Sequence, residues 1–288
     1  MMLAIYKKEL KSYFNSMIGC VFLAILLIII SIYFFVVNML NMIADFSTAL
    51  NAITFVVVLI IPIITMKIIA DENRQKTDQL LLTVPVSVTK IVIGKYLALM
   101  TLYGIGMLVL CFYPLIMSMY GPALMAQSYS SILGFFLMGG SYIAIGLFIS
   151  SLTESQVIAA VISFVVMVFT YIMSSLSMLL PSDNLSVWVI MAGVVLVIAI
   201  VAHMMLRNLI ITGVLFVAGE AAFAAIYFIN PAFYDGLIVK ILSWFSVVDR
   251  FNSFSLGIVD IAALVYYLSV IFVFVFFTIL RVKKKRWS

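Results

Sequence analysis

Side chains that could do chemistry are few in this sequence, and their spacing matches no catalytic motif. His203 is the only histidine, and a lone histidine without a second ligand predicts no metal site. Gly94-Lys95 lacks the upstream glycine of a phosphate-binding loop, and no H-E-x-x-H or G-x-S-x-G sequence occurs. The sequence therefore predicts a chain that is not an enzyme and that binds no cofactor itself.

The charged segment 71–87 is a candidate for a functional role. Its first half is charged, its second half is an apolar turn, and a proline closes it. The candidate contact residues are Asp71, Glu72, Arg74, Lys76, Thr77, Leu80, Leu81, Leu82 and Pro85. A short helix of this kind between two apolar stretches would offer a compact docking knob to a partner. A solvated connection could have the same composition, so the pattern alone leaves both interpretations open.

The composition around these residues is that of a protein embedded in lipid. Hydrophobic residues make up 66% of the chain and charged residues 9%, with a mean hydropathy of +1.32. A soluble domain is about half apolar and a quarter charged, so no soluble fold could bury this much apolar surface. Cys20 and Cys111 fall inside apolar runs, which predicts neither a disulfide nor a metal site.

The apolar runs predict an all-helical, polytopic membrane protein with about eight spans, because one span needs about 20 apolar residues. The predicted spans are 17–38, 51–70, 91–119, 131–152, 156–180, 186–206, 208–229 and 262–281. The first run is too long for a signal peptide and is followed by no small-residue cleavage site, so we expect it to be retained. An even number of spans places both termini on the same side of the membrane.

The distribution of basic residues predicts that this side is the cytoplasm. If the N-terminus is cytoplasmic, 14 of the 16 Lys and Arg residues lie inside, and only Lys240 and Arg250 lie outside. Cytoplasmic loops of membrane proteins carry this excess of Lys and Arg. The same placement explains the net charge of +5 without a nucleic-acid partner.

Glu220 is an ionisable residue deep inside a predicted span. It lies about twelve residues into the run 208–229, roughly 18 Å along a helix. Such residues mark substrate paths or subunit contacts in many membrane proteins. An acid that stays neutral and bonds to a neighbouring helix would explain it as well. We favour this structural role, because the small residues around Glu220 suit close helix packing.

Two segments outside the spans have the pattern of amphipathic helices. In 3–14, apolar residues recur at helical spacing while Lys7, Lys8 and Lys11 occupy other faces, which favours a helix lying in the membrane interface. A charged start that merely orients the first span is the alternative. In the external stretch 230–261, an apolar stripe that includes Trp244 predicts a short helix at the outer surface.

Several short sequences resemble one transporter family in their order along the chain. In the first half they are Thr65-Met66-Lys67, Ala70-Asp71-Glu72, Leu80-Leu81-Leu82-Thr83-Val84-Pro85, Gly94-Lys95-Tyr96 and Ser150-Ser151-Leu152-Thr153-Glu154. In the second half they are Leu242-Ser243-Trp244, Arg250-Phe251, Tyr266-Tyr267 and Arg286-Trp287. Together they resemble the permease subunits of type-2 ABC transporters, in particular the gliding-motility-associated branch, over about residues 1–180 and 235–288.

The resemblance implies one permease domain over 1–288, with the type-2 exporter fold. In that family the loop after the second span is a coupling helix seated in the ATPase, and the N-terminal helix is an elbow. These roles would fall to 71–87 and 3–14, and the short loop at Glu154 would be a second, smaller contact. The family core has six spans, so 186–229 looks like an inserted hairpin. The family usually has glycine where this chain has Lys76.

The resemblance also implies a function and a set of partners. The chain would be the permease of a bacterial inner-membrane exporter, driven by two cytoplasmic ATPase subunits that use ATP and Mg²⁺. A second permease, identical or related, would complete the membrane part, and an extracytoplasmic accessory subunit is compatible with it. The alternative is a membrane anchor or signalling module that does not transport. The sequence names no substrate.

Overall fold

The computed structural model of the chain describes residues 2–76, 87–179, 183, 185–193, 195–196, 209–229 and 231–287. Every regular element among them is a helix, which confirms the predicted all-helical class. The chain divides into two units. The first contains Met1–Tyr171 and Val247–Ser288, and the second contains Ile172–Ser246.

Six stretches of the described residues are helical, long and apolar enough to cross a membrane. They are Ile18–Leu40, Thr54–Gln75, Val88–Tyr120, Met125–Leu152, Gln156–Met173 and Ile261–Lys285. These match six of the eight predicted spans, with ends that differ by at most seven residues. The predicted span 186–206 lies partly outside the described residues, and 208–229 corresponds to the helix α12 (Leu209–Ile229). The total of eight spans therefore stays a prediction.

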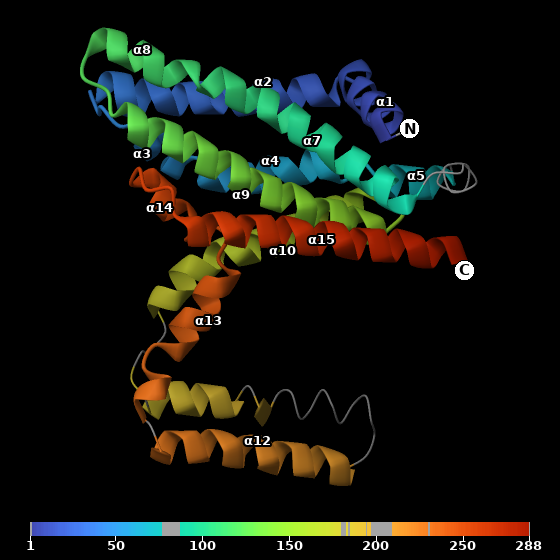
Figure 1. Ribbon diagram of the computed structural model, residues 1–288, viewed down its shortest axis with the longest axis vertical. Helices are drawn as coiled ribbons and strands as arrows, with labels where there is room; N and C mark the ends of the chain where they lie inside the picture. Colours follow the sequence, from blue (N-terminus) through green and yellow to red (C-terminus); the bar gives the residue numbers. More distant parts are fainter. Residues whose placement is uncertain are drawn as a thin grey trace. The chain divides into compact units, whose positions relative to one another are not determined.

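The first unit is a bundle of long helices (Figure 1). Along the chain it contains α2 (Ile18–Tyr33), its π-helical extension η1 (Phe34–Leu40), α4 (Thr54–Thr65), α7 (Val88–Leu110), α8 (Phe112–Tyr120), α9 (Met125–Leu152), most of α10 (Gln156–Leu179) and α15 (Ile261–Trp287). The central helix is α9, because 78% of its apolar stretch is buried inside the protein, against 22% for Ile18–Leu40. It packs against α4, α7 and α15.

Glycines allow this close packing around α9. A Cβ atom at Gly139 would overlap the ring of Tyr103 on α7, and one at Gly146 would overlap Thr65 at the end of α4. Both neighbours are completely buried. Because helices in lipid gain no hydrophobic driving force from meeting each other, small residues that permit direct contact carry much of the packing.

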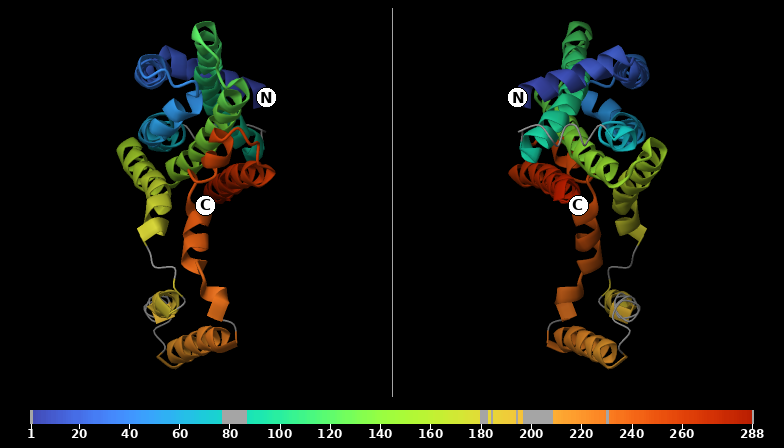
Figure 2. Two further views of the ribbon diagram at one scale, coloured as in Figure 1. Left: turned by 90° about the vertical axis from the view of Figure 1, so that its left-hand side faces the viewer. Right: turned by 90° about the vertical axis from the view of Figure 1, so that its right-hand side faces the viewer.

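The helix α1 (Met2–Asn15) lies crosswise to the long helices. Figure 1 views it nearly end-on, whereas Figure 2 shows its length. Glu9 and Tyr13 are its buried residues. Met17 then makes the turn into α2 with a left-handed backbone (φ 57°). The helix expected over 3–14 is thus present, and both termini of the chain lie at the same end of this unit.

A break in the helix separates α4 from the short α5 (Ala70–Gln75) at that same end. Residues 66–69 form a turn, and α5 has only six residues. Lys76 ends α5 in the left-handed conformation, with φ 56° and ψ 19°. α7 then starts at Val88, so α5 is the described beginning of the segment 71–87.

The opposite end of the first unit is closed by two short helices, α3 (Phe46–Ala52) and α14 (Phe251–Ser255). The side-chain amide of Gln127 joins them, donating to Asp45 Oδ2 at 2.8 Å and to the Ser255 carbonyl at 2.8 Å. Phe251 and Phe254 are completely buried. The stretch 230–261, which the sequence predicts to be external, is therefore in part a packed element of the first unit.

The second unit contains helical residues 185–193 and 195–196, α12, the 3₁₀ turn η2 (Pro231–Tyr234) and α13 (Leu237–Phe245). Tyr234 anchors η2, because its hydroxyl donates to the Phe223 carbonyl of α12 at 2.6 Å. A short helix is present at α13, with Ile238 buried and Trp244 exposed, and its predicted place at the outer surface stays a prediction.

Candidate functional site

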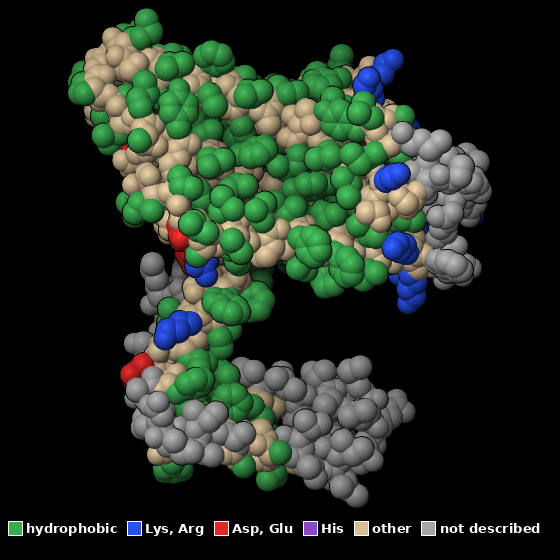
Figure 3. Space-filling view, viewed as in Figure 1, with side chains coloured by type: hydrophobic (Ala, Val, Ile, Leu, Met, Phe, Trp, Pro, Cys, Tyr) green, Lys and Arg blue, Asp and Glu red, His purple; other side chains and the backbone are tan. Residues whose placement is uncertain are grey.

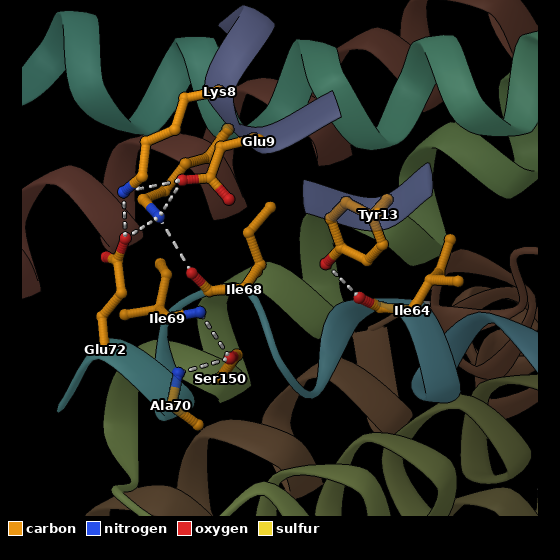
Figure 4. A network of polar contacts seen from close by, with 10 residues as sticks. Lys8, Glu9, Tyr13, Ile64, Ile68, Ile69, Ala70, Glu72 and Ser150 are labelled. Atoms are coloured by element: carbon orange, nitrogen blue, oxygen red, sulfur yellow. Dashed lines mark hydrogen bonds and ion pairs between the residues drawn. The ribbon is translucent and has the colours of Figure 1, made fainter. Parts of the chain in front are cut away.

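The buried ammonium group of Lys95 joins three segments at the end of the first unit that carries α5. Its Nζ atom lies 3.1 Å from Glu9 Oε1 of α1 and 2.8 Å from Glu72 Oε1 of α5 (Figure 4). It also donates to the carbonyl of Ile68, in the turn before α5, at 2.9 Å. An ammonium group has three N–H donors, so all of them are satisfied. We call Lys95, Glu9, Glu72 and the nearby Lys8 the charged junction.

The charges of the junction balance, which makes their burial tolerable. The Lys95 side chain is 2% exposed, that of Glu9 9% and that of Glu72 17%. Lys8, which is largely exposed, lies 3.8 Å from Glu9 Oε1 and 3.7 Å from Glu72 Oε1. Two ammonium groups thus face two carboxylates. An unpaired charge here would bear a desolvation cost of several kcal/mol, so the four side chains depend on one another.

Ser150 of α9 holds the other side of the same turn. Its hydroxyl donates to the Met66 carbonyl at 3.1 Å and accepts from the backbone N–H groups of Ile69 and Ala70, at 3.2 and 3.1 Å. These N–H groups lie at the start of α5 and have no partner within the helix. The break between α4 and α5 is therefore fixed by α7 through Lys95 and by α9 through Ser150.

Tyr13 attaches the crosswise helix α1 to the end of α4. Its hydroxyl donates to the Ile64 carbonyl at 2.6 Å. Burial, and secondarily the carboxylates of Glu9 and Glu72, raise the pKa of Tyr13 well above its usual range. The phenol therefore stays protonated at every physiological pH and remains a hydrogen-bond donor.

Asn73 extends these connections to two further segments. Its side-chain N–H donates to the Thr153 carbonyl in the turn between α9 and α10, at 3.3 Å. Its side-chain oxygen accepts from Lys285 of α15 at 3.0 Å. The short helix α5 thus contacts α1 and α7 through Glu72, and the α9–α10 turn and α15 through Asn73.

The structure brings one of the sequence-predicted residues into this network. Glu72 belongs to the charged junction, whereas Asp71 is half-buried beside it and Arg74 and Lys76 are exposed. Glu154 is exposed in the turn that Asn73 contacts. Thr77, Leu80, Leu81, Leu82 and Pro85 lie outside the described residues.

Glu220 lies half-buried on α12 in the second unit, where it makes no ion pair with any residue that the structure describes. Neither its suggested place on a substrate path nor its structural role is tested by this arrangement.

Sequence reasoning missed Lys95, Glu9, Asn73 and Ser150 as members of a site. For Lys95 a signal was present, since it lies four positions after the start of the predicted span 91–119, and ionisable residues inside spans are rare. It was counted only as a basic residue that sets orientation. Asn73 lies inside the predicted segment 71–87 and Ser150 inside a motif quoted for the family resemblance, but one sequence does not show their partners, which are 80 or more positions away.

Basic side chains gather on the surface around this end of the unit, while hydrophobic side chains cover the flanks of the long helices (Figure 3). Together with the six apolar helices, this defines an α-helical, multi-pass membrane protein with a network of buried charges at one end of its bundle.

The chain belongs to the ABC-2 family of transporter proteins. The family model, described as ABC-2 family transporter protein, matches residues 5–207. No curated protein and no solved structure matches the chain. The chain is therefore the membrane component of an ABC-2 type transporter, and its family implies ATPase partner subunits. The matched region holds no ATPase, and members of this family typically lack catalytic activity of their own.

Proposed function

We propose that the chain is the permease subunit of an exporter in a bacterial cell membrane, driven by ATP hydrolysis in two separate cytoplasmic ATPase subunits. The ATPases use ATP and Mg²⁺, and a second permease, identical or related, completes the membrane part. Within the family, the motifs quoted above favour the gliding-motility-associated branch.

The observation that carries this proposal is the attachment of α5 to the rest of the bundle. α5 begins the segment 71–87, which lies inside the range matched by the family model. A coupling segment must pass on a push from its ATPase without bending away from the spans. Lys95 and Ser150 hold its base, and Asn73 ties it to the α9–α10 turn and to α15. In this proposal, 71–87 is the coupling helix and its surroundings, and the turn at Glu154 is the second contact.

In the proposed topology, both the N-terminus and the C-terminus lie in the cytoplasm. The basic residues of α1, α5 and the end of α15 lie at the end of the bundle where both termini lie. The crosswise α1, whose Lys7, Lys8 and Lys11 are exposed, has the geometry of an elbow helix in the cytoplasmic interface. Positive charge on the cytoplasmic side is the rule for such proteins.

The proposal also assigns roles to the segment 186–229 and to α13. We assign 186–229 to an inserted hairpin that adds two spans to the six-span core. α13 would lie in the outer interface, since Ile241, Trp244 and Phe245 are exposed on one helix. An extracytoplasmic accessory subunit would meet the transporter on this side.

The coupling role is tested by replacing Leu80, Leu81 and Leu82 with Asp. We expect the triple variant to insert normally but to lose copurification of the ATPase and stimulation of ATP hydrolysis, because the docking turn becomes charged. Replacement of the same residues by Met is the matched control and should preserve both. Survival of both properties in the Asp variant would contradict the assignment of 71–87.

Transport itself is tested by deleting the ATPase subunit and measuring efflux of a panel of lipids, peptides and dyes from cells. An exporter requires the ATPase for efflux of at least one substrate. Unchanged fluxes for the whole panel after the deletion, together with copurification of the ATPase with the chain from undeleted cells, would instead identify a membrane anchor or signalling module.

A further inference from the structure

A hollow lined by residues of α5, α7 and α15 borders the charged junction. Ile91 and Val92 of α7 form part of its apolar wall, and Arg281 and Lys285 of α15 supply basic side chains. About 40 Å³ inside it is free for the centres of water-sized groups, and one water needs about 10–15 Å³. The hollow therefore has room for roughly three water-sized groups, which is enough for the two unesterified oxygens of a phosphodiester.

The charges in this hollow favour an anion. Glu72 lines the hollow, but its carboxylate is already neutralised by Lys95 at 2.8 Å and by Lys8 at 3.7 Å. Arg281 is exposed and makes no ion pair or hydrogen bond with any residue in the described part of the chain. An anion that enters would meet this guanidinium group and the ammonium group of Lys285.

We propose that this hollow binds the phosphate of an acidic phospholipid, with Arg281 as its main ligand and Lys285 as the second. The planar guanidinium group matches two phosphate oxygens at once, which a lysine cannot do. The apolar wall of Ile91 and Val92 faces the part of the lipid next to its headgroup. Basic pockets between helices at the membrane surface bind acidic lipid headgroups in this way.

The position of the hollow favours a lipid over a soluble phosphate. It lies close to where α7 begins, at Val88, and close to where the apolar part of α15 ends, at Arg281. In the proposed topology both helix ends lie at the boundary of the hydrocarbon core, next to the lipid phosphates. The proposed topology, on which this step rests, places the site in the cytoplasmic leaflet, where acidic lipids attract basic segments.

Binding of a phosphate in the hollow would affect α5 through one hydrogen bond. Lys285 donates to Asn73 Oδ1 at 3.0 Å, so a phosphate that draws on Lys285 acts on the side chain that joins α5 to the α9–α10 turn. If the proposed coupling role of 71–87 holds, acidic lipid would tune the coupling of the transporter.

The test compares two pairs of substitutions with the same change in net charge. Arg281→Gln/Lys285→Gln removes the basic residues that line the hollow, whereas Lys283→Gln/Lys284→Gln removes two neighbours on α15 that are not among its described lining residues. The full-length chain is purified in neutral detergent, and binding of phosphatidylglycerol is titrated by native mass spectrometry, with phosphatidylcholine as the reference lipid. Neither the ATPase nor nucleotide is present, so the outcome is independent of the proposed transport function.

We expect the first pair to weaken phosphatidylglycerol binding about tenfold, as for the loss of one charge-assisted hydrogen bond or more. The second pair should change it less than twofold. Equal loss in both pairs would overturn the proposal in favour of diffuse attraction to the basic helix end. Displacement of the lipid by millimolar inorganic phosphate would overturn the lipid assignment in favour of a soluble anion.

A second variant protects the test against misfolding of the first. Arg281→Gln alone leaves the bond between Lys285 and Asn73 in place, and we expect it to lose most of the binding. Arg281→Lys retains the charge without the planar fork and should bind between the wild type and Arg281→Gln. If Arg281→Gln binds phosphatidylglycerol as tightly as the wild type, Arg281 is not the ligand and the proposal fails.

Discussion

Replacement of Lys95 by Met would remove the ammonium group that holds the charged junction together. Methionine has a similar length and no charge, so the change isolates the polar contacts from the packing. It leaves the carboxylates of Glu9 and Glu72 facing each other with one nearby cation, Lys8, and it leaves the Ile68 carbonyl without its donor. The substitution therefore creates buried charges without a buried partner.

The expected cost follows from the burial of the three side chains. Removal of one partner from a buried ion pair costs about 3–5 kcal/mol. Lys8 offsets little of this, because its side chain is 63% exposed and exposed pairs contribute only about 0–1 kcal/mol. We therefore expect a loss of about 3 kcal/mol in the free energy of unfolding, a large part of the 5–15 kcal/mol typical of folded proteins.

The assay is equilibrium unfolding in mixed detergent micelles containing increasing sodium dodecyl sulfate. The matched control is the neutral triple variant Lys95→Met/Glu9→Gln/Glu72→Gln, which has no buried charge left to desolvate. Exchange of a complete buried ion network for neutral groups is often without cost, so the triple variant should recover most of the loss. If Lys95→Met unfolds like the wild type, or if the triple variant is no more stable than the single one, the buried junction does not stabilise the fold as argued.

Further predictions concern the turn before α5, the end of α5 and the packing of α9, and unfolding in mixed micelles measures all of them. Ser150→Ala should lose about 1–3 kcal/mol, because two buried N–H groups and one carbonyl lose their partner, and a variant as stable as the wild type would refute this cap. Lys76→Gly should gain up to about 1 kcal/mol, because the left-handed backbone at φ 56° strains any residue with a Cβ, whereas Lys76→Val should lose stability. Gly146→Ala should lose about 1–3 kcal/mol through overlap with Thr65, while Gly193→Ala, with open space around it, should change stability by less than about 1 kcal/mol.

Hydropathy alone predicted most of the bundle, because the membrane imposes its thickness on every span. The helices Met125–Leu152 and Ile261–Lys285 appear within a few residues of the predicted 131–152 and 262–281. The presence of a helix over 3–14 was also predictable, since Lys7, Lys8 and Lys11 interrupt an otherwise apolar helical repeat. These features depend on the local sequence pattern, and the thickness of the bilayer sets the minimum length of each span.

The closure of the bundle at the end that carries α3 and α14 was not predictable in the same way. α14 is short and its sequence resembles a surface loop, yet Phe251 and Phe254 are buried against α9. Their environment is set by contacts with residues more than 100 positions away, such as Ser131, whose hydroxyl donates to the Phe254 carbonyl at 3.3 Å. Periodicity in the sequence carries no information about such partners.

The left-handed backbone at Lys76 gives a physical reason why glycine would suit this position. The resembled family usually has glycine at this position, and glycine adopts a positive φ without steric cost. Here a lysine takes the same conformation, with φ 56° and ψ 19°. The bonds from Lys95 and Ser150 fix the turn before α5 and do not involve its last residue.

The charged junction differs from the spans, because the sequence does not show that its residues lie together. Glu72 was predicted from the segment 71–87, whereas Lys95 was counted only as a basic residue that sets orientation, and 86 positions separate Lys95 from Glu9. Only the fold shows that one ammonium group binds both carboxylates and the turn between α4 and α5. Because these bonds share one nitrogen atom, α5 cannot shift away from α7 without also breaking the attachment of α7 to α1 or leaving a buried charge unpaired. A small displacement of α5 must therefore move α1 and α7 with it, whatever force acts on α5, because the same charged groups hold all three helices.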